Sequence, residues 1–251
     1  MSFKDYFSNH AADYARYRPH YPVALVEYLV SLVPSRDSAW DCATGNGQVA
    51  LGLANHFQQV VATDASQQQL DQAFLHDRIR NHRATAEQSG LPNQSIDLIT
   101  VGQALHWFNL DGFYAEAKRV LKPKGVLAVW CYAMLSIPGA NESVQAVLQT
   151  FYDRIEPHWP PGRELVDAGY RTIPFPFAEV TPPPLAMTAD WTVAELFGYL
   201  SSWSATQRWL AEVGPNPFQQ FGEELATAWG QADDRHTIHW PLSLRVGTHK
   251  D

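Results

Sequence analysis

The sequence of 251 residues is poor in cysteine, with only Cys42 and Cys131. So few cysteines suggest neither a disulfide framework nor a cysteine metal site, and we expect both thiols to be reduced and buried. The ten histidines show no H-E-x-x-H or other ligand spacing. The sequence therefore predicts no metal centre.

Long apolar runs and basic clusters are absent as well. The amino terminus, Met1–Asp5, leads into polar and aromatic residues, with no apolar stretch long enough for a signal peptide or a membrane span. We therefore expect a cytoplasmic protein without a membrane partner. The formal net charge of −8 and the lack of a basic run argue against nucleic acid as a partner, because that binding needs clustered Lys and Arg.

The length suits one large α/β domain, so a second domain is not required. We expect a monomer or a homodimer whose chain forms a single domain over 1–251. Its predicted parts are an aromatic arm or lid over 1–21, a cofactor-binding core over 22–133, lid helices with an edge strand over 134–235, and a last core strand over 236–248.

The stretch Trp40–Gln48 joins a short buried strand, which Asp41 closes, to a helix. Within it, Ala43, Gly45 and Gly47 have little or no side chain. The backbone can therefore turn tightly there, and a ligand can approach it closely. We interpret this stretch as a cofactor-binding loop.

An acidic residue, Asp64, ends the next apolar run, Val60–Asp64. Its offset from the loop is close to the ~20 residues at which a carboxylate receives ribose hydroxyls in nucleotide-binding βαβ units. Loop and carboxylate together predict an adenosine cofactor. The loop also fits the G-x-G-x-x-A form of the dinucleotide fingerprint, so an NAD(P)-dependent oxidoreductase remains an alternative.

Strands alternate with helices up to residue 130, which predicts a parallel sheet covered on both faces. Further strands are expected near 80–84, over 95–101 and over 126–130. Beyond Tyr132 this alternation ends. The sequence there predicts a helix, a Pro-rich passage, an edge strand within 178–189 that Pro182–Pro184 must limit, and two helices over about 192–230.

Several motifs in this order resemble the class I S-adenosylmethionine-dependent methyltransferases, and the likeness is strongest to the type 11 group. They are Asp41–Gln48, Asp64, Ala86-Glu87, Ile96–Ile99 and Arg119–Gly125. The segments Tyr14–Pro22 and Gln103–Phe108 are similar to a subgroup of small-molecule enzymes that includes trans-aconitate methyltransferase. The resemblance covers residues 7–131 and implies a doubly wound, mostly parallel seven-stranded sheet with an antiparallel last strand and a helical lid.

The resemblance also implies a cofactor, S-adenosyl-L-methionine, with S-adenosyl-L-homocysteine as its product. Asp64 would take the ribose hydroxyls, Ala86 would present its backbone to the adenine edge, and Gln103 would sit under the sulfonium. Ala43 stands where the family has its first glycine, so we expect a slightly displaced ligand. The full implied set is Tyr14, Arg18, Asp41, Ala43, Gly45, Gly47, Asp64, Ala65, Ala86, Glu87 and Gln103.

The acceptor side is predicted at the carboxyl end of the fourth strand, where His106 and Trp107 follow Gln103. His106 is the best-placed base, with packing beside Trp107 as its alternative. Trp130, Tyr132 and Trp203 are candidates for the acceptor pocket, although such rings are often core residues. Four arginines are candidate partners for an anionic acceptor, and the sequence does not choose among Arg163, Arg171, Arg208 and Arg245.

The function predicted first is methyl transfer to a small-molecule acceptor, with O-methylation of a carboxylate favoured. A carboxylate needs no proton removed, whereas a hydroxyl or an amine would benefit from a base. Besides the oxidoreductase, the sequence leaves open an accessory protein that binds S-adenosylmethionine without catalysis. An RNA acceptor is disfavoured by the acidic charge.

Overall fold

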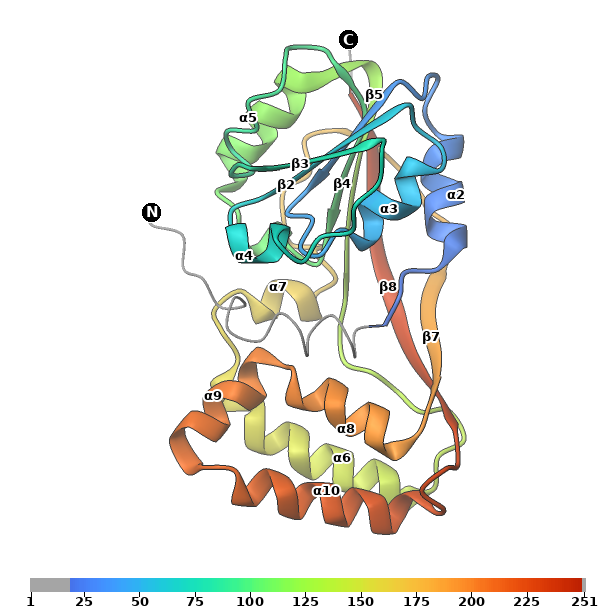
Figure 1. The fold of residues 1–251 in the computed structure, drawn as a ribbon, viewed down its shortest axis with the longest axis vertical. Coiled ribbons are helices and arrows are strands. Elements are labelled where there is room, and N and C mark those ends of the chain that lie inside the picture. The colour runs from blue at the N-terminus through green and yellow to red at the C-terminus, as the bar shows by residue number, and fades with distance from the viewer. Residues whose placement is uncertain (1–18, 250–251) are drawn as a thin grey trace.

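The computed structural model describes residues 19–249. Figure 1 shows an upper body, in which helices flank a twisted sheet, and a lower body of helices; β7 and β8 run between them. The strands are β1 (Ser38–Cys42), β2 (Gln59–Asp64), β3 (Ile79–Arg83), β4 (Ile96–Gly102), β5 (Leu121–Tyr132), β6 (Ala178–Val180), β7 (Leu185–Trp191) and β8 (His236–Thr248). The sheet order is β3-β2-β1-β4-β5-β8-β6, with β7 also paired to β8.

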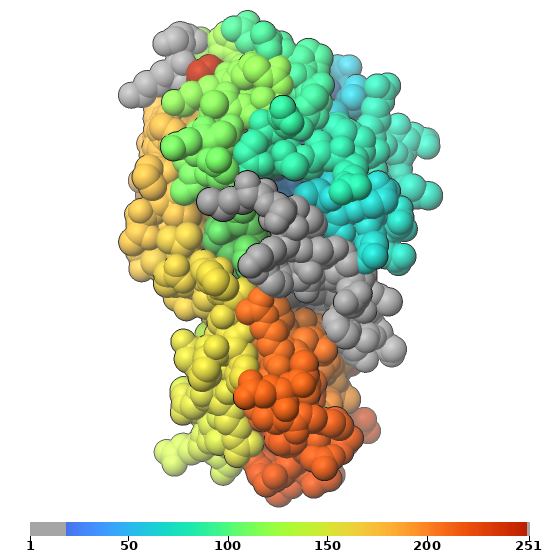
Figure 2. Space-filling view, turned by 90° about the vertical axis from the view of Figure 1, so that its left-hand side faces the viewer, coloured from blue at the N-terminus to red at the C-terminus, as the bar shows by residue number. Residues whose placement is uncertain are grey.

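The helices of the upper body are α2 (Val23–Ser31), α3 (Gln48–Ala54), α4 (Gln67–Leu70) and α5 (Leu110–Val120). The lower body contains α6 (Glu142–Ile155), α8 (Val193–Ser201), α9 (Ser204–Val213) and α10 (Asn216–Trp229). Between the two bodies lies α7 (Arg163–Asp167). Of the 3-10 helices, η2 (Leu105–Trp107) contacts α7, and η3 (Glu156–His158) contacts α6 and α9. In Figure 2 yellow residues lie below the green surface of the upper body and beside the orange residues of the lower body, whose helices form the lid.

The sheet confirms the predicted fold. Strands β1 to β5 are parallel, and β8 pairs antiparallel with β5, β6 and β7. Two short strands, β6 and β7, both pair with β8 at this edge of the sheet. They are separate strands because the run Pro182–Pro184 lies between them and proline cannot donate to a ladder. The predicted edge strand is therefore present but split.

Strand β8 connects the sheet to the lid. Its residues 242–248 pair with β5, whereas residues 236–242 pair with β7. The strand expected over 236–248 is thus shared, with one half in the core sheet and the other under the lid helices. Because a long strand is continuous through both bodies, the lid is fixed to the sheet by backbone hydrogen bonds as well as by side-chain packing.

The lid has an aromatic core of its own. Phe151 stacks on Phe221 and Phe197 stacks on Phe218, each pair with ring centroids 4.3 Å apart. Three helices occupy 192–230, one more than predicted, since α8 ends at Ser201 and α9 begins at Ser204. Such ring pairs stabilise the packing of the lid helices against one another.

Loop 85–91 is held against α5 by a buried carboxylate. Glu116 accepts hydrogen bonds from the backbone N–H of Ser89, at 2.9 Å, and from its hydroxyl. Arg119 donates to both oxygens of Glu116 at 2.8 and 2.7 Å. These bonds, led by that of Arg119, lower the pKa of Glu116 to about 2. The loop that carries Ala86 and Glu87 is therefore fixed by a charged group.

Glu116→Gln is expected to lower the free energy of unfolding at pH 7 by roughly 1–2 kcal/mol, a modest value because Arg119 is 37% exposed and screened by water. The folded pKa lies below the ordinary value of 4.5. The carboxylate therefore stabilises the fold above that value and loses its effect as the pH falls toward 2. Urea unfolding at pH 7 and pH 3 measures this. An equal deficit at both pH values would assign the loss to packing instead.

Within residues 19–249, no helix is long and apolar enough to cross a bilayer. In the same range, no group of three or more His, Cys, Asp or Glu side chains is arranged to hold a metal ion. Cys42 and Cys131 are buried, free thiols.

Candidate active site

The glycine-rich loop turns through residues in the left-handed backbone conformation. The φ angles of Ala43, Gly45 and Gly47 are 55°, 57° and 84°. A Cβ built on Gly45 would meet nothing closer than Gln69 Oε1 at 3.8 Å, so the space above this residue is open. Ala43 has a methyl group in a conformation that costs an L-residue about 1–2 kcal/mol. The loop therefore leaves room for a ligand against its backbone, as a bound adenosyl cofactor requires.

The side chain of Asp41 holds this loop through hydrogen bonds. Its carboxylate is buried and accepts hydrogen bonds from the Thr100 hydroxyl at 2.8 Å, from the Thr44 hydroxyl, and from the Ala50 backbone N–H at 3.1 Å. Burial, only partly offset by these bonds, raises the pKa of Asp41 to about 6. Both oxygens are occupied by the chain itself, so we expect Asp41 to act on a cofactor by holding the loop in place.

Asp64 lies at the end of β2 beside the same loop. One carboxylate oxygen accepts the Gly45 N–H and the other accepts the Ser66 N–H, both at 2.9 Å. A carboxylate oxygen accepts more than one hydrogen bond, so this geometry is compatible with ribose hydroxyls. Ala65, next in the chain, turns its carbonyl to Arg83 Nε at 3.0 Å. The residues present therefore fit the adenosine group that the sequence predicts.

Ala86 and Glu87 lie in the loop after β3. Ala86 is buried, and Glu87 accepts the backbone N–H of Asn109 at 2.9 Å. Asn109 is the N-cap of α5. The Glu87 carboxylate thus joins the predicted adenine-side loop to the first turn of α5.

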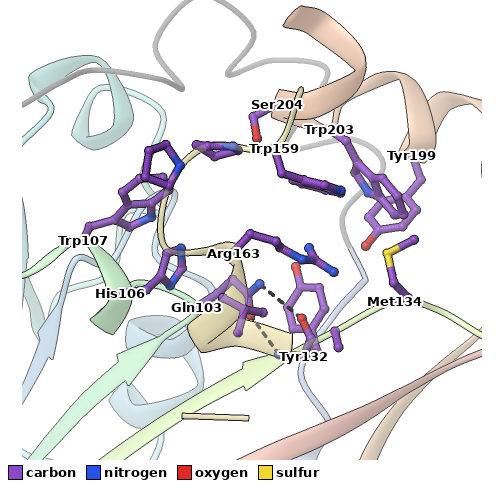
Figure 3. A pocket seen from close by; sticks show the side chains of 14 residues that line it. Gln103, His106, Trp107, Tyr132, Met134, Trp159, Arg163, Tyr199, Trp203 and Ser204 are labelled. Carbon is purple, nitrogen blue, oxygen red and sulfur yellow. Dashed lines mark hydrogen bonds between the residues drawn. The ribbon is translucent and has the colours of Figure 1, made fainter. Parts of the chain in front are cut away.

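Gln103 connects the ends of β4 and β5. Its amide donates to the Tyr132 carbonyl at 3.2 Å and accepts the Tyr132 N–H at 2.8 Å, the dashed bonds of Figure 3. Its φ of 57° turns the chain away from β4. Gln103 thereby fixes the two strand ends that form the floor of a pocket.

This pocket lies between the carboxyl ends of the strands and the lid. Figure 3 shows Gln103, His106 and Tyr132 on the strand side and Trp159 with Trp203 opposite, while Arg163 extends into the space between. The lining residues are Gln103, His106, Trp107, Tyr132, Ala133, Met134, Trp159, Pro160, Pro161, Arg163, Val166, Tyr199, Trp203 and Ser204. Most of these residues are aromatic or apolar, and none of them, all from the described range 19–249, has a carboxylate.

His106 and Trp107, predicted as a pair, line this pocket from η2. Their rings lie 4.6 Å apart, and His106 Nδ1 lies 2.8 Å from the Tyr170 hydroxyl. Burial, assisted by the Arg163 charge, lowers the pKa of His106 to about 4. The imidazole is therefore neutral at pH 7.

Among the four candidate arginines, only Arg163 lines the pocket. Its guanidinium lies over the Trp159 ring, 4.2 Å from the centroid, and Nε donates to Asp167 at 2.9 Å. Arg245 is paired with Glu179, Arg208 donates to the His158 carbonyl, and Arg171 is exposed.

Tyr132 and Trp203 line the pocket. Trp130 does not line it, so its predicted place in the acceptor pocket is corrected. Trp130 is fully buried and its ring meets Tyr21 edge-on at 5.4 Å. It lies two residues before Tyr132 on the same face of β5, roughly 6.6–6.8 Å deeper in the sheet. The predicted Trp130 contact with an acceptor is therefore replaced by packing in the core.

Two predicted cofactor contacts, Tyr14 and Arg18, and all of the arm except residues 19–21 lie outside the described residues. The sequence also missed groups that the pocket contains. Trp159, Tyr199 and Met134 line it, and Tyr170 supports His106 from behind. The Pro157–Pro161 run marks the first of these positions, but the others have no local signal.

The comparisons with known proteins point the same way as this geometry. A family model described as a methyltransferase domain matches residues 40–129, which include the glycine-rich loop, Asp64 and His106. A protein of Dictyostelium discoideum, named a "putative methyltransferase", is 32% identical over 233 residues, covering 92% of this chain and 89% of the relative.

Solved structures agree. One from Anaeromyxobacter dehalogenans, described as a "putative type II methyltransferase", is 38% identical with a TM-score of 0.85, covering 93% of this chain and 98% of the other. A phosphoethanolamine N-methyltransferase of Haemonchus contortus, solved with S-adenosylhomocysteine, has a TM-score of 0.51 at 16% identity. It covers 100% of this chain and 61% of its own, and at that identity it shows the fold alone.

Proposed function

Because this chain belongs to the class I S-adenosylmethionine-dependent methyltransferases, we propose that it methylates the carboxylate of a small-molecule acid bound beside Arg163. Family membership decides against the oxidoreductase that the glycine-rich loop alone left open. The observation that supports the finer proposal is the position of Arg163, the sole Lys or Arg among the residues of 19–249 that line the pocket.

The family implies S-adenosylmethionine as the methyl donor. When bound, it supplies a methyl group on a sulfonium and leaves as the neutral thioether S-adenosylhomocysteine. We assign its ribose to Asp64, its adenine to the loop at Ala86, and its methionine portion to the backbone of Gly45 and Gly47. These groups come from the ends of β1, β2 and β3, the edge of a parallel sheet where ligands bind.

A carboxylate matches the pocket in charge and shape. The guanidinium of Arg163 offers a planar fork that suits a carboxylate. Its Nε is already oriented by Asp167, and its flat face rests on Trp159. Within residues 19–249 no acidic residue lines the pocket, and the carboxylate nearest to the guanidinium, that of Asp167, is paired with Arg163 itself. The aromatic remainder suits an apolar body attached to the acid.

This reaction needs little acid–base catalysis from the protein. A carboxylate oxygen supplies the electron pair of the new O–CH3 bond, and the electrons of the broken S–CH3 bond remain on sulfur. No proton is released. The task of the chain is to hold the oxygen in line and exclude water. Trp159 and Trp203 line the pocket from the lid side, and we assign to them the exclusion of water.

An acceptor screen tests the proposal. The purified protein is incubated with methyl-labelled S-adenosylmethionine and matched sets of aromatic and aliphatic acids, their amides, phenols and amines. We expect label transfer to acids and none to the amides of the same skeleton. Transfer to phenols or amines, with acids inert, would refute the carboxylate while leaving the enzyme class intact.

A further inference from the structure

Behind the pocket, Tyr170 contacts the imidazole that faces the acceptor. Its hydroxyl oxygen lies 2.8 Å from His106 Nδ1, and its side chain is fully buried. Tyr170 follows α7 and is 64 residues from His106 in the sequence. Its φ of 59° is in the left-handed region. Its backbone carbonyl accepts a hydrogen bond from Arg245 at 2.8 Å. The phenol is thus held firmly in one position.

The same oxygen faces the beginning of η2. Burial raises the pKa of Tyr170, and the backbone at Leu105 and His106 partly opposes that shift.

The buried Tyr170 hydroxyl has one proton to donate. Within residues 19–249, the hydrogen-bond acceptor in contact with the Tyr170 hydroxyl is His106 Nδ1. A buried hydroxyl proton without an acceptor costs roughly 1–3 kcal/mol, so the proton points at Nδ1. Nδ1 must then carry a lone pair, and in a neutral imidazole the remaining proton is on Nε2.

We propose that Tyr170 fixes His106 as a hydrogen-bond donor, with its Nε2–H directed at the acceptor's oxygen beside Arg163. His106 is then a binding and orienting group, because its Nε2 has no lone pair with which to remove a proton. Over the described part of the chain, 19–249, no residue forms a hydrogen bond with Nε2. Tyr170 is a positioning residue that acts through His106.

This assignment revises the sequence-based prediction that His106 is the base, and it deepens the proposed function. A donor N–H next to a guanidinium binds an oxygen that is already anionic, and such an oxygen needs no base. The proton position rests on geometry alone, while the acceptor's identity rests on the proposed function. A pKa of about 4 for His106 agrees with a group that is neutral in the working enzyme.

Nitrogen NMR of the 15N-labelled protein at pH 7 tests the proton position without substrate. The His106 signals are identified by their loss in His106→Gln. We expect the Nε2–H tautomer in the wild type and a mixture of tautomers in Tyr170→Phe. The matched control is Tyr114→Phe, which removes another buried phenol hydrogen bond, that to the Pro174 carbonyl at 2.7 Å, and should leave the tautomer unchanged. An Nδ1–H tautomer in the wild type would overturn the proposal.

Kinetics provide a second test that does not depend on Tyr170→Phe folding. His106→Gln places an N–H close to the position of Nε2 but cannot act as a base. We expect it to keep kcat/KM within roughly 10-fold of wild type, while His106→Ala loses roughly 10- to 100-fold through the missing hydrogen bond. Equal losses in both variants would show that a base is required. If acids are not methylated at all, the NMR result still stands, so the two proposals fail separately.

Discussion

Replacing Asp64 with alanine is expected to weaken S-adenosylmethionine binding by roughly 100-fold or more, because two ribose hydrogen bonds to a charged group contribute about 1.5–3 kcal/mol each. The variant also frees the N–H groups of Gly45 and Ser66, which Asp64 now accepts at 2.9 Å. Loss of that support loosens the loop and adds to the effect. Isothermal titration with S-adenosylmethionine and S-adenosylhomocysteine measures it.

Two variants serve as controls for this prediction. Asp77→Ala makes the same change at an exposed site and should bind the cofactor like wild type. His106→Ala should also leave cofactor affinity nearly unchanged while it lowers turnover. If Asp64→Ala and His106→Ala abolished cofactor binding equally, the division between a cofactor side and an acceptor side would be wrong.

Arg163→Met is expected to reduce kcat/KM for a carboxylate acceptor by roughly 100-fold or more, since a forked pair of charge-assisted hydrogen bonds is lost. Cofactor affinity should stay at the wild-type value. Arg163→Lys should recover only part of the activity, because an ammonium lacks the planar fork and does not stack on Trp159 in the same way. Steady-state kinetics with the best acid from the acceptor screen provide the numbers.

The matched control for Arg163 is Arg171→Met. Arg171 is exposed and does not line the pocket, so this variant removes the same charge from the same segment without touching the acceptor. We expect wild-type kinetics. A similar loss in both variants would mean that Arg163 acts through the net charge of the segment, and the anion site would have to be sought elsewhere.

The upper body could be predicted from the sequence because its signals are local. Asp41, the glycine-rich loop and Asp64 lie at consecutive strand ends, and each is marked by an apolar run followed by a polar or small residue. His106 could be placed for the same reason, since it follows β4 directly. The likeness to the trans-aconitate subgroup stays a prediction, because the comparisons establish the class without it.

The lid side of the pocket could not be predicted, because its contacts join distant parts of the chain. Trp159 lies within a proline-rich passage that has no periodic pattern, and Arg163 follows it. Tyr170 contacts His106 across 64 residues. Trp130 shows the complementary error. Alternation places it on the same strand face as Tyr132, but only the tertiary packing decides which of the two rings reaches the cavity.

The chemical stability of the product tests the central claim most directly. After transfer of a labelled methyl group from S-adenosylmethionine to the acid selected by the screen, the product is treated with alkali and volatile methanol is counted. The account predicts that the label is released, since a methyl ester hydrolyses in base. Label that remains on the product would show an ether or N-methyl bond and contradict methylation of a carboxylate.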